Sequence, residues 1–116
     1  MKPSEILRKA RGLITPEGAW TKGESARDAN GNAVTRPHTD VSCRCVDAAL
    51  YDASGVTPGP GSGATAEYAL YQEAYGFFRS VVGGCHVTWN DDPARTHAEV
   101  LAAFDRAAEM AEGEGS

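Results

Sequence analysis

Large apolar side chains are scarce in this sequence. Leu, Ile, Val and Phe together supply 18 of the 116 residues, whereas alanine alone supplies 19. The formal net charge is only −5, so charge repulsion does not force the chain to be disordered. A small domain with so little apolar volume must pack its helices closely or gain buried area from a partner. We therefore predict a single domain over residues 1–111 and a disordered tail over residues 112–116, and we consider a homodimer.

Long hydrophobic runs are absent as well. No stretch of 18 consecutive apolar residues occurs, so we predict no segment that spans a membrane. The first residues, MKPSEILRKARG, are charged throughout and lack the apolar stretch of a signal peptide. Cysteine occurs three times, an odd number that favours reduced thiols over a disulfide framework. These features predict a cytoplasmic protein.

Basic residues are too few for nonspecific nucleic-acid binding. The chain has 11 Lys and Arg against 16 Asp and Glu, and phosphate contacts require clustered positive charge. Arg8, Lys9 and Arg11 form a small cluster near the N-terminus. Three charges make a small footprint, so we interpret this cluster as a solvated helix face.

Four segments have the apolar periodicity of helices, and together they predict a mainly α fold. Ser4, Glu5 and Pro16 supply start and stop signals for the first of them. Thr39 or Asp40 could cap the second. The expected helices cover residues 4–14, 41–53, 66–82 and about 93–112. Residues 85–89, CHVTW, alternate in polarity and are predicted to be extended.

Asn30-Gly31 is a strong turn signal, because both residues tolerate a positive φ. The flanking segments, residues 23–28 and 32–35, would be the arms of a small β-hairpin. The predicted fold is therefore a compact four-helix domain with a hairpin between helices 1 and 2. The expected core residues are Ile6, Leu7, Leu13, Cys45, Leu50, Leu70, Phe77, Phe78, Val100, Leu101 and Phe104.

A tyrosine stripe runs along the third predicted helix. Tyr68, Tyr71 and Tyr75 are three or four residues apart, so they share one helix face. Aromatic residues at this spacing usually belong to a core. Tyrosine also combines apolar area with a polar tip, so contact with a partner or ligand stays open.

The segment from Trp89 to Val100, WNDDPARTHAEV, carries the densest group of chemically distinct side chains. Asp91 or Asp92 could cap a helix that begins at Pro93. Thr96 and Glu99 have the T-x-x-E spacing of a capping box. Capping leaves Trp89, Asn90 and His97 unexplained. His97 is predicted to lie on the apolar side of the helix. There it is either a hydrogen-bonded structural group or a catalytic or ligand-binding residue.

Three blocks of the sequence resemble an uncharacterised family of small bacterial and bacteriophage proteins. The C-terminal block is Trp-Asn-Asp followed by Arg-Thr and Glu-Val, at residues 89–91, 95–96 and 99–100. The others are Trp20-Thr21-Lys22-Gly23 and the segment from Cys45 to Leu50, where Ala48 replaces a glycine common in the family. The resemblance implies an intracellular, mostly helical single domain with no known activity.

A zinc site is not predicted, although the chain has three cysteines and three histidines. No CxxC or HxxxH spacing occurs. Cys43 and Cys45 would point apart on the predicted helix, and the adjacent Cys85 and His86 would diverge. We therefore expect neither a metal nor another cofactor. The remaining candidate ligands, His38 and His97, are isolated in sequence.

Two functions remain open. The first is a binding or regulatory protein that acts through a protein partner or through self-association, in a phage-related context if the resemblance holds. Its candidate site combines Trp20, Arg27, Trp89, Asn90, Asp91, Arg95 and His97. The second is a small thiol-dependent enzyme in which Cys45 is the nucleophile, His97 the base, and Asp91 or Asn90 the group that orients the base. Both predict that these residues meet in one region.

Overall fold

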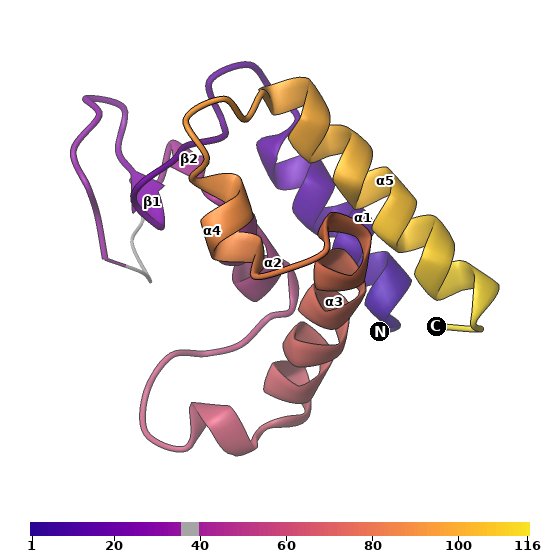
Figure 1. The fold of residues 1–116 in the computed structure, drawn as a ribbon. Helices are drawn as coiled ribbons and strands as arrows, with labels where there is room; N and C mark the ends of the chain where they lie inside the picture. The colour runs from indigo at the N-terminus through magenta and orange to yellow at the C-terminus, as the bar shows by residue number, and fades with distance from the viewer. Residues whose placement is uncertain (36–39) are drawn as a thin grey trace.

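The computed structural model describes residues 1–35 and 40–116. This part of the chain forms five α-helices and one two-stranded antiparallel sheet (Figure 1). Their bounds are α1 Pro3–Ile14, β1 Ala26–Arg27, β2 Cys43–Arg44, α2 Val46–Ala53, α3 Ala66–Val82, α4 His86–Asn90 and α5 His97–Gly113, with a 3-10 turn at Ser62–Ala64 before α3. The predicted mainly helical class is confirmed. The predicted number of helices is wrong, because a fifth helix lies between α3 and α5.

The core lies where α1 packs against α2 and α5, and where α3 crosses this layer (Figure 1). Helix α5 contributes mainly small side chains to it: Ala103, Ala107, Ala108 and Ala111 are all buried. Short side chains at a helix contact allow the helix axes to approach more closely. This is how an alanine-rich chain builds a core from few large residues.

Most of the expected core residues are buried. Ile6, Leu7, Leu50, Phe78 and Phe104 are completely inaccessible, as is Val100, and Cys45 is nearly so. Four others are only partly buried and pack against the edge of the core: Leu13, Leu70, Phe77 and Leu101. The tyrosine stripe divides in the same way, because Tyr71 is buried while Tyr68 and Tyr75 are partly exposed.

The predicted turn at Asn30-Gly31 is present, but the strand pairing differs from the expectation. Gly31 has a φ of 84°, and the Asp28 carboxylate accepts hydrogen bonds from the backbone N–H groups of Asn30 and Asn32. The two arms form only an isolated bridge, Arg27 to Ala33, with the Asp28 N–H donating to the Asn32 carbonyl and the Val34 N–H to the Ala26 carbonyl. The strand β1 instead pairs with β2, so the sheet partner comes from residues 43–44 rather than from residues 32–35.

Helix α2 begins at Val46, five residues later than predicted. Cys43 is in β2, and Cys45 is the N-cap residue with extended backbone angles. The expectation that both cysteines lie on a helix is therefore wrong. The strand pairing and the cap bond from the Ala48 N–H to the Cys45 sulfur fix this boundary. Thr39, a predicted cap, lies outside the described residues.

The segment predicted to be extended, residues 85–89, is helical from His86 onwards. His86 and Asn90 are buried and Trp89 is partly buried, which is the i, i+3, i+4 pattern of one helix face. Helix α5 begins at His97 rather than at residue 93, where the predicted capping box forms. The Thr96 N–H donates to the Glu99 carboxylate at 2.9 Å, and the Thr96 backbone and side chain hold the Glu99 pKa below its ordinary value.

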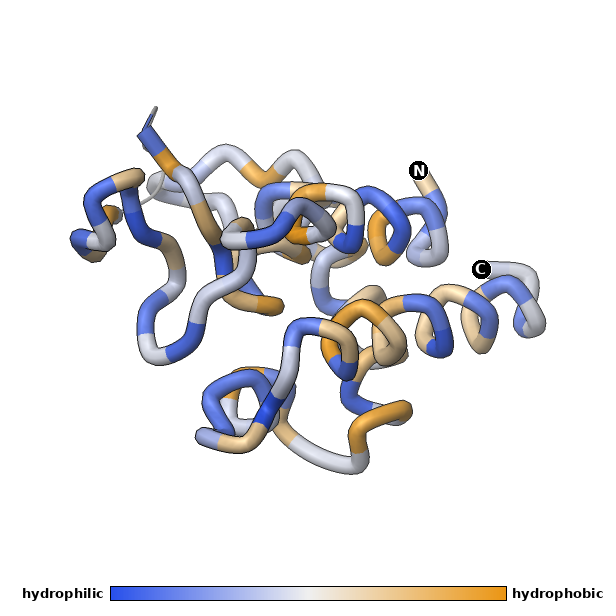
Figure 2. Tube along the Cα trace, turned by 90° about the horizontal axis from the view of Figure 1, so that it is seen from above, coloured by the Kyte–Doolittle hydropathy of each residue, from blue (hydrophilic) through white to orange (hydrophobic). Residues whose placement is uncertain are grey.

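Both termini lie on the same side of the molecule, as the view from above shows (Figure 2). The N–H and hydroxyl groups of Ser4 donate to the backbone oxygen of Ser116 at 3.1 and 2.8 Å. Hydrophobic positions recur along the helices in the same view. Within residues 1–35 and 40–116, none of the helices combines the length and the apolar character needed to cross a bilayer.

Candidate functional site

Asn90, at the end of α4, joins three separate parts of the chain. Its side-chain oxygen accepts hydrogen bonds from the Trp20 indole N–H at 2.7 Å and from the Val46 N–H at 3.0 Å. Its side-chain nitrogen donates to the Thr21 carbonyl at 3.1 Å and to the Asp91 carboxylate at 2.9 Å. Both lone pairs and both N–H groups of the amide are used, and the residue is completely buried. We call Asn90 and its hydrogen-bond partners, Trp20, Thr21, Val46 and Asp91, the clasp.

Trp20 and His97 extend the clasp to the start of α5. Their rings stack with centroids 6.0 Å apart and planes 7° apart. The His97 Nε2 atom lies 2.6 Å from the Ile14 carbonyl, so Nε2 carries a proton and donates it. His97 therefore fixes the end of α1 against α5, and its Nε2 atom is not a free base.

Asp91 and Arg27 hold the loop between α1 and β1. The Asp91 carboxylate accepts the Gly23 N–H at 2.9 Å. The Arg27 guanidinium donates to the Thr21 hydroxyl at 2.9 Å, to the Lys22 carbonyl at 3.2 Å and to the Gly31 carbonyl at 3.1 Å. The Arg27 guanidinium therefore donates to the loops on both sides of β1. The structure therefore brings Trp20, Arg27, Asn90, Asp91 and His97 together through internal hydrogen bonds.

Trp89 and Arg95 lie beside the clasp and face a groove. The Arg95 guanidinium carbon is 3.9 Å from the centre of the Trp89 ring, and its Nε donates to the Trp89 carbonyl at 3.0 Å. The indole also makes a T-shaped contact with Phe78 of the core, with ring centroids 5.5 Å apart. The groove has a volume of about 250 Å³, and its lining residues are Val81, Val82, Trp89, Arg95, Glu99, Ala102, Ala103 and Arg106.

Cys45 lines a different and smaller cavity, of about 190 Å³. Asp47 and Asp91 line it as well, together with Gly23, Glu24, Ser25 and Val87. His97 is not among the residues that line this cavity, and neither is any other histidine of the described chain. The cavity therefore does not pair the thiol with the imidazole that the enzyme hypothesis uses as its base.

A partly buried polar network that the sequence analysis missed is centred on Asp47, one of the residues that line this cavity. The His86 Nε2 and the Tyr71 hydroxyl both meet Asp47 Oδ1, at 2.6 and 2.5 Å. The Arg79 Nε donates to His86 Nδ1 at 2.9 Å, so His86 is the neutral tautomer with its proton on Nε2. Tyr75 stacks on His86 with centroids 5.1 Å apart, and Arg79 lies over the Tyr75 ring.

Burial raises the pKa of Tyr71 above its ordinary value, and the hydrogen bond to Asp47 adds to the effect. The phenol therefore stays a hydrogen-bond donor to the carboxylate. The network links α2, α3 and α4. The sequence signal that could have revealed part of it is the four-residue spacing of Tyr71, Tyr75 and Arg79, which places all three on one face of α3.

The cysteines and histidines do not converge. Cys43 and Cys45 are buried, Cys85 is exposed, and all three are free thiols. The backbone N–H of Thr88, and then its side chain, lower the pKa of Cys85 below its ordinary value. In residues 1–35 and 40–116, no three His, Cys, Asp or Glu side chains cluster as metal ligands would. His38 lies outside the described residues.

The chain was compared with protein families, curated proteins and solved structures. No curated protein and no solved structure matches the chain significantly. A family model described as a family of unknown function, DUF6197, matches residues 1–110. The expectation of an uncharacterised domain family is confirmed at this level. By this match over nearly its whole length, the chain belongs to the DUF6197 family of unknown function.

Proposed function

We propose that the protein is a binding module that holds a protein partner in the groove beside Trp89. The observation that carries the proposal is the pairing of Trp89 with Arg95 on the wall of this groove. Tryptophan and arginine are the residue types that contribute most to protein interfaces. Val81, Val82 and Ala102 add apolar surface to the same groove.

The charges of the groove indicate the chemistry of the partner. Arg95 is partly neutralised by Asp92 and Glu99, at 3.9 and 3.4 Å. Arg106 forms no salt bridge with any residue in the described part of the chain. An exposed cation beside an apolar groove complements a segment with an apolar side chain next to carboxylates. The partner we propose therefore carries leucine-like and acidic residues.

The other candidate residues make contacts within the molecule, which leaves Trp89 and Arg95 for contact with a partner. Trp20, Asn90, Asp91 and His97 use polar atoms to hold the molecule together, and Arg27 uses its guanidinium in the same way. Their role in the proposal is to position α4, which carries Trp89, against the start of α5. Trp89 and Arg95 are then the residues that contact the partner directly.

The test uses nuclear magnetic resonance with a synthetic peptide in which one leucine is flanked by glutamates. Its control peptide has glutamine at every glutamate position. We expect saturable shifts of the Trp89 indole N–H signal and of backbone signals of Val82 and Ala102 with the acidic peptide, and clearly weaker shifts with the control. The Trp89→Phe variant assigns the indole signal.

The matched variants are Arg106→Gln, in the groove, and Arg8→Gln, an exposed arginine on α1 outside it. Loss of one charge contact should weaken peptide binding several-fold in Arg106→Gln and leave it unchanged in Arg8→Gln. Absence of saturable shifts, or equal binding by both variants, would overturn the proposal.

A further inference from the structure

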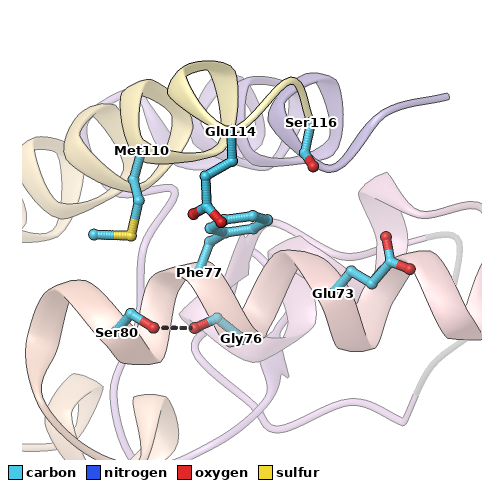
Figure 3. A pocket seen from close by; sticks show the side chains of 7 residues that line it. All are labelled: Glu73, Gly76, Phe77, Ser80, Met110, Glu114 and Ser116. Carbon is cyan, nitrogen blue, oxygen red and sulfur yellow. Dashed lines mark hydrogen bonds between the residues drawn. The ribbon is translucent and has the colours of Figure 1, made fainter.

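A second cavity lies further along the same pair of helices. It has a volume of about 470 Å³ and is lined by Glu73, Gly76, Phe77, Ser80, Met110, Glu114 and Ser116. Figure 3 shows Met110 and Glu114 reaching from α5 towards α3, with the Phe77 ring between the two helices. Met110 is 40% exposed, although it is a large apolar residue. This cavity therefore adds exposed apolar surface on the same two helices that line the groove beside Trp89.

The residues that line the two cavities form a strip along one face of α5. On α5 their lining residues are Glu99, Ala102, Ala103, Arg106, Met110 and Glu114, which are one, three or four residues apart and so share a helix face. On α3, Glu73, Gly76, Phe77 and Ser80 share one face and line the second cavity, while the consecutive residues Val81 and Val82 at the end of the helix line the groove beside Trp89. A helix of 17 residues is about 25 Å long, so the strip extends along most of both helices. We call it the α3–α5 strip.

The free charges on the strip are separated by sign. Arg106 lies at the Trp89 end, while Glu73 and Glu114 lie at the Met110 end. Glu73 and Glu114, like Arg106, make no salt bridge within the described part of the chain. Phe77, Val81 and Met110 supply apolar surface between these ends. The free positive charge of Arg106 therefore lies four residues before Met110 and the free negative charge of Glu114 four residues after it, with apolar surface between them.

We infer that the partner of this groove is a second copy of the same chain, packed antiparallel on the α3–α5 strip about a two-fold axis. The inference rests on the proposed function and names its partner. A two-fold axis beside Met110, which lies midway between Arg106 and Glu114, places Glu114 of one copy against Arg106 of the other, and the symmetric pair forms as well. The second copy thereby supplies a carboxylate to the groove beside Trp89, and the two exposed Met110 side chains meet near the axis.

Space for the second copy exists at the middle of the strip. A Cβ atom built on Gly76 meets nothing within 4 Å, and Ser80 and Ala102 are also small and exposed. Small residues at this position allow the α5 helix of the other copy to approach. The chain is also poor in large apolar residues, and a copy docked on the strip adds buried apolar area.

The test is sedimentation of the full chain over a wide range of concentrations, with a charge exchange. We expect a dimer that dissociates on dilution. Glu114→Arg and Arg106→Glu should each raise the dissociation constant by about tenfold or more, since each breaks two symmetric contacts, and the double variant should restore most of the affinity. Glu17→Arg, an exposed loop residue outside the strip, is the matched charge control.

A steric pair completes the test. Gly76→Leu should block the strip, while Gly12→Leu, at another open helical glycine, should leave association unchanged. Circular dichroism checks that both variants are folded. A monomer at every concentration overturns the inference. So does a dimer whose dissociation constant is changed neither by the charge exchange nor by Gly76→Leu. If the acidic peptide still shifts the Trp89 signal of such a monomer, the proposed function stands; if it does not, both fall.

Discussion

The Trp20 indole N–H donates to the side-chain oxygen of Asn90, which is 70 residues away in the sequence; the indole nitrogen and the amide oxygen are 2.7 Å apart. The same oxygen accepts the first free N–H of α2, from Val46. Two orphan donors are thus satisfied by one completely buried acceptor. Loss of the Asn90 side chain would therefore remove four hydrogen bonds at once.

Asn90→Ala should therefore lower the free energy of unfolding by about 2–4 kcal/mol. A buried polar group left without a partner costs about 1–3 kcal/mol, and this substitution strands the buried Val46 N–H. It also removes the partner of the Trp20 N–H and of the Thr21 carbonyl, which are partly buried. Urea unfolding measures the effect as a fall in the midpoint at constant slope. Asn30→Ala, at the exposed turn, is the control. Equal losses in the two variants would contradict the role of the clasp.

Tyr71 should make the protein less stable at high pH. Its pKa is raised in the folded state, mainly by burial, so its contribution is fully present below the unfolded pKa of about 10 and is lost as pH rises towards the folded value. Between about pH 9 and about pH 11 the wild type should lose more stability than Tyr71→Phe. Urea unfolding at the two pH values measures this difference.

Tyr68→Phe is the matched control for Tyr71→Phe, because it removes a hydroxyl from the same helix face at a partly exposed position. Its pH dependence should follow the wild type. The near-ultraviolet absorbance of phenolate gives a second readout: the Tyr71 signal, taken as wild type minus Tyr71→Phe, should appear only above the pH at which free tyrosine ionises, or on unfolding. If the Tyr71 phenolate signal appeared in the folded protein at the pH at which free tyrosine ionises, the prediction would be wrong.

Local signals in the sequence predicted the elements that depend on local physics. Helix α3 matches its expected bounds, residues 66–82, because Thr65 caps it and Gly83 ends it with a φ of 80°. The capping box of Thr96 and Glu99 formed where it was expected. The five-residue helix α4 was misread, because an alternating pattern that short fits a strand and a buried helix turn equally well.

The polar networks could not be predicted, because their partners are far apart in sequence. His86 meets Asp47 across 39 residues and Tyr71 meets Asp47 across 24. Only the packing of α2, α3 and α4 brings them together, and no spacing rule describes it. The Trp20–Asn90 contact is of the same kind: the sequence indicated that both residues needed an explanation but not that they bond to each other.

Cys85 should be the thiol that reacts first with an alkylating reagent. It is exposed and its pKa is lowered by the Thr88 backbone N–H, whereas Cys43 and Cys45 are buried. With a small excess of iodoacetamide, the native protein should gain one adduct, the Cys85→Ser variant should gain none on the same timescale, and both should react fully in denaturant. Mass spectrometry counts the adducts. Native modification of Cys45 at a comparable rate would contradict this order and would revive the thiol-enzyme hypothesis.

Gly12→Ala and Gly76→Ala should each stabilise the monomer by about 0.5–1 kcal/mol. Both glycines are inside helices, neither has a positive φ, and an added Cβ meets nothing within 4 Å at either position. Alanine removes conformational entropy from the unfolded chain and favours the helix, at no steric cost. Urea unfolding at low protein concentration measures this gain. At high concentration the two variants should diverge, because only Gly76 lies in the α3–α5 strip and its methyl group meets the second copy. A gain at Gly12 without one at Gly76 in the dilute protein would mean that something already covers Gly76 in the monomer.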